Sequence, residues 1–221
     1  MSQLLEAFSW LADPTRWSGT DGIPTRLLEH LWYTALGVVV AAVIAVPIGL
    51  LVGHTGRGRG LVVALSGAAR ALPTLGLITL FGLWLGIGLK APILAFVVLA
   101  IPSLLAGAYS AVESVDPRTV DAARAQGMTE WQILSRVEVP LGLPLLISGF
   151  RLAIVQVVAT VMLASYIGNG GLGRFIFLGL QLQDYPQMLA GSILVVALAL
   201  VLDVALRVLE RLLAPRGAAR G

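Results

Sequence analysis

The run from Leu31 to Val52 limits the fold of this chain more than any other stretch. It holds about 22 residues without a single Asp, Glu, Lys or Arg. As a helix rising about 1.5 Å per residue, such a run crosses a hydrocarbon layer of roughly 30 Å. A helix also satisfies its backbone hydrogen bonds internally, which lipid cannot do for an open strand. The sequence therefore predicts an all-α integral membrane protein.

The composition of the whole chain agrees with this prediction. Hydrophobic residues make up 57% of the 221 residues and charged residues 12%, about half the charged fraction of a soluble domain. Cysteine is absent, which excludes disulfide scaffolds, thiolate metal sites and cysteine nucleophiles. The net charge of +3 is modest and the arginines are dispersed without interleaved aromatics, so no nucleic-acid partner is expected. His30 and His54 stand beside the two ends of the first apolar run, where structural roles are expected and not metal ligation.

Five membrane spans are predicted. Residues 1–29 mix Trp and Leu with Pro and Gly and are expected to lie along the membrane interface. The segment 61–89 is too long for one straight span and short for two; we interpret it as one helix broken near Arg70 and Pro73, with two short helices as the alternative. The other spans after the first are expected at Ile93–Val112, Leu141–Ile167 and Pro186–Leu206.

A polar island from Asp116 to Pro144 interrupts the apolar runs. Asp116 before Pro117 forms an N-cap with a first-turn proline, and Gly127 supplies a helix stop. Thr129 stands three residues before Gln132, a capping box that predicts a second short helix, ending before Pro140.

The side chains of these two helices are typical of a docking surface. Ala122, Ala123 and Ala125 allow close approach of another backbone, and Trp131 and Leu134 share one face of the second helix. On this pattern alone, a solvated loop helix is the alternative.

The spacing within the island resembles the Glu-Ala-Ala loop of permease subunits of ATP-binding-cassette (ABC) importers. The family pattern is Glu-Ala-Ala, three residues, Gly, nine residues, Ile, any residue, Leu, Pro. Val137 and Val139 replace Ile and Leu, and Asp replaces Glu. The similarity extends from about Leu61 to Arg207 and is closest to permeases for glycine betaine, carnitine and choline. The Asp that replaces Glu is Asp121. The positions that match the pattern outright are Ala122, Ala123, Gly127 and Pro140.

The resemblance implies a type I ABC importer permease fold, with about five transmembrane helices and a cytoplasmic coupling-helix loop at 114–140. In that family the loop, which here includes Trp131, fits into a groove on a separate ABC ATPase that binds ATP and Mg. A second permease chain, identical or a sister, and an extracytoplasmic substrate-binding protein complete the importer. Residues 30–212 would form the permease domain and 213–221 a cytoplasmic tail.

For function, the resemblance implies uptake of a compatible solute such as glycine betaine, choline or carnitine. Permeases for methionine or sulfonates share the loop and remain an alternative. No catalytic residue, cofactor or metal ligand is expected on this chain. A membrane-embedded enzyme would need an acid and a base converging at mid-depth, and Arg70, Arg151 and Asp203 do not form such a pair in the sequence.

Arg151 lies about halfway along its predicted span. An arginine there costs roughly 2.5 to 3.5 kcal/mol unless it is paired or faces water, so its side chain should face the protein interior. It is interpreted either as a contact near the translocation path or as a structural tie to a helix end or carbonyl. Arg70 stands where related permeases usually carry a glutamine. Asp203 and Arg207, four residues apart, should form an ion pair.

The segment Gly168–Gly173 formally satisfies G-x-G-x-x-G. A dinucleotide site requires a preceding strand and a βαβ unit, whereas an apolar helix precedes the glycines here. The sequence predicts instead a non-cytoplasmic turn in which backbones pack closely.

Lys and Arg in the short loops predict the orientation. The loop at 53–60, the polar island and the last helix end with its tail carry two, three and four of them, nine in total. This bias places the coupling loop and the C-terminus in the cytoplasm and the N-terminus outside the cell membrane. The opposite side carries four: Arg16, Arg26, Lys90 and Arg174.

Overall fold

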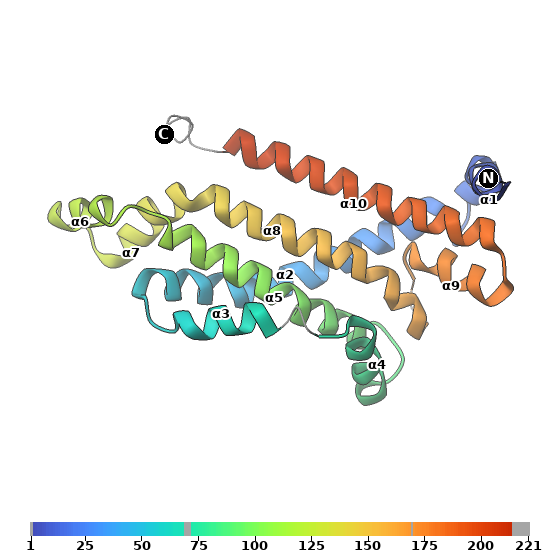
Figure 1. Cartoon of the computed structure of the whole chain (residues 1–221), viewed down its shortest axis with the longest axis horizontal. Helices are drawn as coiled ribbons and strands as arrows, with labels where there is room; N and C mark the ends of the chain where they lie inside the picture. The colour runs from blue at the N-terminus through green and yellow to red at the C-terminus, as the bar shows by residue number, and fades with distance from the viewer. Residues whose placement is uncertain (1, 69–71, 169, 214–221) are drawn as a thin grey trace. The chain divides into compact units, whose positions relative to one another are not determined.

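The computed structural model describes residues 2–68, 72–168 and 170–213, and every regular element in these ranges is helical (Figure 1). The chain divides into two compact units. Unit 1 comprises Met1–Val39, Leu72–Val97 and Ile154–Leu202. Unit 2 comprises Val40–Ala71, Val98–Ala153 and Asp203–Gly221.

Four stretches of the described chain are long and apolar enough to cross a membrane. They contain α2 (Ile23–Thr55), α5 (Lys90–Glu113), α8 (Val139–Val161) and α10 (Tyr185–Leu213), the third counted with its flanking turns as Glu130–Ile167. Pro47 and Pro102 lie inside α2 and α5 without ending them. The all-α membrane fold predicted from composition and apolar runs is confirmed.

The second predicted span, at 61–89, is interrupted near Pro73, as predicted. The structure has α3 (Arg59–Ala68) and α4 (Thr74–Leu85) there, two helices of 10 and 12 residues. At about 1.5 Å per residue each is roughly 15 to 18 Å long, too short to cross alone. Pro73 is the extended residue before α4, because a proline cannot continue a helix from a preceding turn. Arg70 lies outside the described residues.

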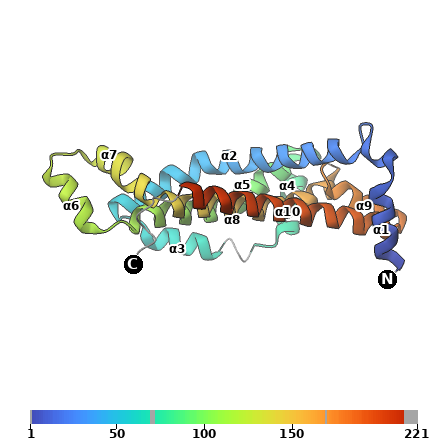
Figure 2. The same ribbon diagram turned by 90° about the horizontal axis from the view of Figure 1, so that it is seen from above.

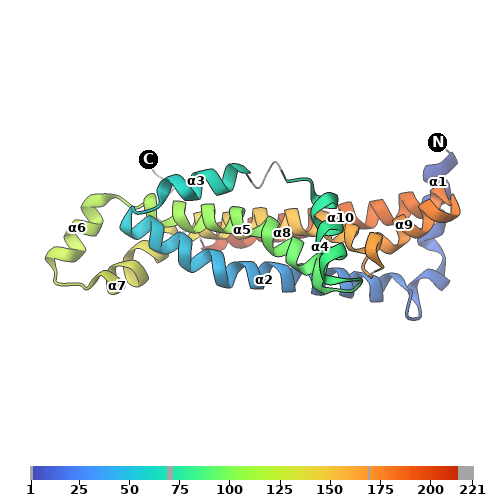
Figure 3. The ribbon, with the colours of Figure 1, turned by 90° about the horizontal axis from the view of Figure 1, so that it is seen from below.

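Unit 1 has an aromatic core near the start of the chain. α1 (Ser2–Ala12) lies beside α9 (Gly173–Leu182) and the first turns of α10 in Figure 3, and the 3₁₀ turn η1 (Pro14–Trp17) follows it in the chain. Trp10 meets Phe175 edge to face, with ring centroids 5.3 Å apart. The opposite side of α1 exposes Leu4, Leu5 and Phe8. The location of this segment at the membrane interface stays a prediction.

Unit 2 is held together by glycines that let its helices approach closely. A Cβ on Gly107 would lie 2.6 Å from the Cα of Gly149, and one on Gly49 would lie 2.7 Å from the Ala108 side chain. A Cβ on Gly142 would overlap the backbone of Ala111. α2, α5 and α8 therefore pack backbone to backbone in this unit. Two short helices, α6 (Pro117–Ala125) and α7 (Glu130–Ile133), form the loop at its end (Figure 2).

Candidate functional site

The polar island folds as its sequence predicts. The Asp116 side chain caps α6 by accepting from the Arg118 N–H at 2.8 Å, with Pro117 in the first turn. The helix ends at Gln126, and Gly127 follows with a φ of +81°, a conformation that favours glycine. Thr129 and Gln132 form the capping box of α7, at 2.9 and 3.3 Å. Both helix starts and the glycine stop are confirmed.

The predicted end of the second helix before Pro140 is wrong. α7 passes directly into η3 (Leu134–Glu138), a π-helical stretch, and α8 begins at Val139. The Val139 N–H donates to the Leu134 carbonyl, five residues back. In an ordinary α-helix the proline ring would clash with the carbonyl four residues earlier, and the wider π turn relieves this clash. The chain therefore stays helical from the loop into the membrane span.

An apolar groove of about 330 Å³ runs beside this continuous helix in unit 2. Trp131 contributes its indole and is 73% exposed, whereas Leu134, predicted on the same face, is 5% exposed. Both side chains line the groove, so the shared face predicted from their spacing is confirmed. α2 forms the facing wall with Val46, Pro47, Leu50 and Leu51.

Ion pairs join α6 to α7. The Arg124 guanidinium donates to both oxygens of Glu130, at 2.7 and 3.0 Å, and to Asp121 at 3.2 Å. The hydrogen bonds with Glu130 raise the pKa of the Arg124 guanidinium. Asp121 and Ala122 are exposed, and Ala123 is buried. Within the family pattern, Asp121 and Ala122 therefore lie on the outer surface of the loop, whereas Ala123 packs inside it.

The sequence did not identify His54 as part of this site. It lies in the last turn of α2 and its imidazole is 10% exposed. Its Nδ1 is 2.6 Å from a carboxylate oxygen of Glu138, and its Nε2 is 3.1 Å from Glu130. The Glu138 side chain is nearly fully buried, and its neighbours in the chain are Val137 and Val139. A carboxylate inside an apolar stretch was the available signal, but its partner stands 84 residues away.

Arg151 lies against two carboxylates of α10, and one of them, Glu210, is in the last turn of that helix. The Arg151 side chain is 18% exposed, with Nη1 at 3.3 Å from Asp203 and Nε at 3.6 Å from Glu210. Asp203 also accepts from Arg207 at 2.8 Å, which confirms the predicted i,i+4 pair. Arg151 and Asp203, which sequence reasoning left unpaired, therefore form an ion pair of unit 2. A role for Arg151 near the pathway stays a prediction.

The described residues of the glycine segment, 168 and 170–173, form the close backbone packing predicted for unit 1, and their non-cytoplasmic location stays a prediction. Gly168 and Gly171 have φ values of +87° and +86°. The Gly171 N–H donates to Glu29 at 2.8 Å, and a Cβ on Gly173 would overlap the backbone of Met162. The turn therefore packs onto α2 and onto η4 (Met162–Ile167), the 3₁₀ turn at the end of α8.

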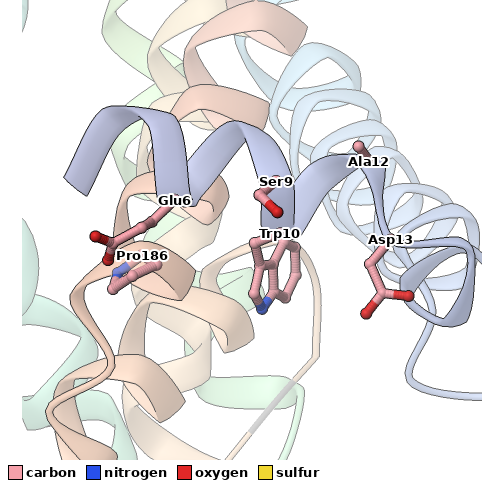
Figure 4. Close-up of a pocket in the computed structure, with 6 residues that line it drawn as sticks. All are labelled: Glu6, Ser9, Trp10, Ala12, Asp13 and Pro186. Atoms are coloured by element: carbon pink, nitrogen blue, oxygen red, sulfur yellow. The ribbon is translucent and has the colours of Figure 1, made fainter. Parts of the chain in front are cut away.

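A second hollow, of about 550 Å³, opens beside α1 in unit 1 (Figure 4). Asp13 is already engaged there: hydrogen bonds from the Thr15 backbone and hydroxyl lower the pKa of its carboxyl. The hollow is lined by Glu6, Ser9, Trp10, Ala12, Asp13 and Pro186.

Within the described ranges, no group of three His, Cys, Asp or Glu side chains is placed to hold a metal ion.

Long apolar helices with a two-helix polar loop define a membrane permease of the type I ABC importer fold. The structure aligns with a chain of the MetNI methionine ABC transporter in an inward-facing conformation, with a TM-score of 0.74 and 24% identity, covering 87% of this chain and 96% of that chain. Residues 45–216 match the family model described as binding-protein-dependent transport system inner membrane component. The chain belongs to this family.

Two relatives extend the similarity to most of the chain. The glycine betaine/carnitine/choline transport system permease protein OpuCB of Bacillus subtilis is 32% identical over 189 residues, 86% of this chain and 87% of the relative. The osmoprotectant import permease protein OsmW of Salmonella typhimurium is 35% identical over 197 residues, 86% of this chain and 90% of the relative.

Proposed function

We propose that this chain is the membrane permease subunit of an ATP-driven importer for compatible solutes such as glycine betaine, choline or carnitine. Membership of the permease family and the names of relatives that align over most of the chain support this substrate class. The MetNI likeness supports the fold alone, and nothing in the described structure favours methionine or a sulfonate over compatible solutes.

The loop at 114–140 docks on a separate ABC ATPase and transmits its movement to the helices. The observation that carries this proposal is the exposed Trp131, which lines an apolar groove on a helix that continues through η3 into α8. An exposed aromatic beside an apolar groove is typical of a protein interface. The continuous helix gives a direct mechanical connection between the docking surface and a membrane span.

The other parts of the importer follow from the same assignment. A second permease chain, identical or a sister, would complete the translocation pathway, and an extracytoplasmic binding protein would deliver the solute. ATP and Mg would bind to the ATPase, so this chain needs no cofactor and catalyses no reaction. Arg70 and Arg151 remain candidates for contacts near the pathway.

The chain is oriented with its N-terminus outside and its C-terminus in the cytoplasm. The positive charges gathered in the loop at 53–60, the polar island and the tail support this orientation. Because the chain lacks cysteine, a single Thr129→Cys variant can be labelled cleanly in intact cells. We expect protection from a membrane-impermeant maleimide and labelling after permeabilisation, with Ser18→Cys behaving in the opposite way. Labelling of Thr129→Cys from outside would overturn the orientation.

Gly127→Asp tests the coupling role of the loop. Gly127 has a φ of +81°, and a Cβ added there would meet open space, so the substitution adds backbone strain and a charge without a clash. We expect the complex to assemble while solute uptake per ATP hydrolysed falls about tenfold, within the usual range of coupling free energies.

Gly56→Asp is the matched control. Gly56 has a φ of +68°, is equally open and lies outside the loop, in the turn after α2. Uptake and ATP hydrolysis are measured in proteoliposomes containing the permease, its ATPase and the binding protein. Normal coupling in Gly127→Asp would remove this loop as the transmission surface.

A further inference from the structure

The imidazole of His54 joins three elements of unit 2. It lies in the last turn of α2, contacts Glu138 of η3 at 2.6 Å and contacts Glu130 of α7 at 3.1 Å. The two contacts use different ring nitrogens. Since the imidazole is 10% exposed and the Glu138 side chain 6% exposed, water competes little for the bond between them.

The two contacts together define the charge of the ring. An ionised carboxylate only accepts hydrogen bonds, and a neutral imidazole has one N–H donor. Two ionised carboxylates are therefore satisfied at once only by an imidazolium, which donates from both nitrogens. A neutral ring would turn a lone pair toward one of the two carboxylates.

We propose that His54, as an imidazolium, is the positioning residue that fixes α7 and η3 against the end of α2 and so sets the shape of the ATPase docking surface. This inference rests on the proposed function of the loop at 114–140. The apolar groove has one wall on α2 and the other on α7, η3 and the first residue of α8, and His54 ties these same elements together. Loss of the tie would let the walls separate while the helices themselves remain folded.

His54 and its two carboxylate partners, Glu130 and Glu138, are called the clamp below. Charged contacts continue from the clamp to a residue of the family pattern. Glu130 accepts from Arg124 of α6, which also donates to Asp121, the acidic residue of the pattern. A path of charged contacts thus runs from the first membrane span to the outer helix of the loop. α2 holds the inner end of this path, and displacement of α2 would be transmitted to α6 and α7.

Two other charged groups of the neighbouring elements have partners of their own. On α5, Glu113 bonds with Tyr109 and pairs with Arg59 of α3 at 2.9 Å. On α6, Arg124 is held by Glu130 and Asp121. In the described part of unit 2, the charged groups in contact with the His54 ring are the carboxylates of Glu130 and Glu138.

His54→Gln tests the clamp, with Arg59→Gln as the control. Arg59→Gln removes an ion pair near the end of α2 that does not touch α6 or α7. In proteoliposomes with ATPase and binding protein, we expect His54→Gln to lower uptake per ATP hydrolysed about tenfold, equivalent to about 1.4 kcal/mol. Arg59→Gln should couple normally. Normal coupling in His54→Gln would overturn the proposal.

A second variant removes the ambiguity of misfolding. His54→Gln leaves the buried Glu138 carboxylate without its cation, which can destabilise the fold by itself. The double variant His54→Gln/Glu138→Gln removes this unpaired charge, so we expect thermal stability and complex assembly to recover while the tenfold coupling loss remains. Recovery of coupling together with stability would mean that His54 has only a structural role, and would overturn the proposal.

The wild-type complex separates failure of the clamp from failure of the proposed function. If the wild-type complex itself shows no ATP-driven uptake, the proposed function fails first, and this result is distinct from failure of the clamp alone.

Discussion

The two histidines of the chain lie on the same helix, α2, and their surroundings give them opposite chemistry. In unit 1, His30 is fully buried; its Nε2 is 2.9 Å from the Val158 carbonyl, and its Nδ1 accepts from the Leu172 N–H at 3.3 Å. One donor and one acceptor define a neutral ring. In unit 2, His54 faces two carboxylates and holds both only as a cation.

This contrast separates two ways of holding a membrane helix. The region around His30 and the glycine turn uses neutral hydrogen bonds and backbone contact, which stabilise one geometry and respond little to pH or salt. The region around His54 and the loop uses charged contacts between helices at a partly exposed surface, which can be broken and remade. Variants in the first region should therefore change stability, and variants in the second should change coupling.

The largest effect is expected for Gly173→Ala, in the first region. The added methyl group would overlap the backbone of Met162, which cannot move aside as a side chain does. We expect a stability loss of about 3 kcal/mol or more, the upper end of the cost of overpacking, and little folded permease in membranes.

Gly60→Ala is the control for that variant, because a methyl group at this position of α3 meets open space. The measurements are yield after membrane extraction and the midpoint of thermal unfolding in micelles. Wild-type stability of Gly173→Ala would show that the glycine turn does not pack against η4 as described.

A smaller effect is expected for His30→Phe. The ring size is nearly kept, but the Val158 carbonyl and the Leu172 N–H lose their partner in a buried place, which costs about 1 to 3 kcal/mol for each unsatisfied group. Thr34→Val is the control, since the Thr34 hydroxyl donates to the His30 carbonyl within the same helix. If His30→Phe keeps the wild-type unfolding midpoint and instead lowers uptake per ATP hydrolysed, the contrast between the His30 and His54 regions is wrong.

Sequence reasoning succeeded where the signal is local. The cap at Asp116, the stop at Gly127 and the capping box of Thr129 each depend on residues within three or four positions, and the structure has all of them. The apolar runs likewise predicted the four long membrane helices, because hydropathy is a property of the run itself.

Sequence reasoning failed where the contact partner is remote or the backbone departs from regular geometry. The Glu138 carboxylate pairs with an imidazole 84 residues away, and no periodicity connects the two positions. The π turn before Pro140 keeps a helix intact that proline alone would end. The segment 61–89 has the composition of a membrane span, but its described residues form two short helices, α3 and α4, with Pro73 immediately before the second.

The smallest effect on stability is expected for Arg124→Gln, at the outer end of the charged path. Arg124, Glu130 and Asp121 are all substantially exposed, so water already solvates these groups and their ion pairs contribute little to folding. The unfolding midpoint should match that of the wild type. Coupling should fall by less than in His54→Gln, because α7 remains tied to α2 through His54 while only α6 is released.

High salt distinguishes the contacts of Arg124 from those of His54. Exposed ion pairs are screened at a Debye length of about 3 Å in roughly 1 M salt, whereas the bond between His54 and the buried Glu138 is screened much less. High salt should therefore lower coupling of the wild-type complex to the level of Arg124→Gln but not to that of His54→Gln. If salt reduces the wild type to the His54→Gln level, the inner contact is no stronger than the outer one, and the two ends of the path act as a single surface network.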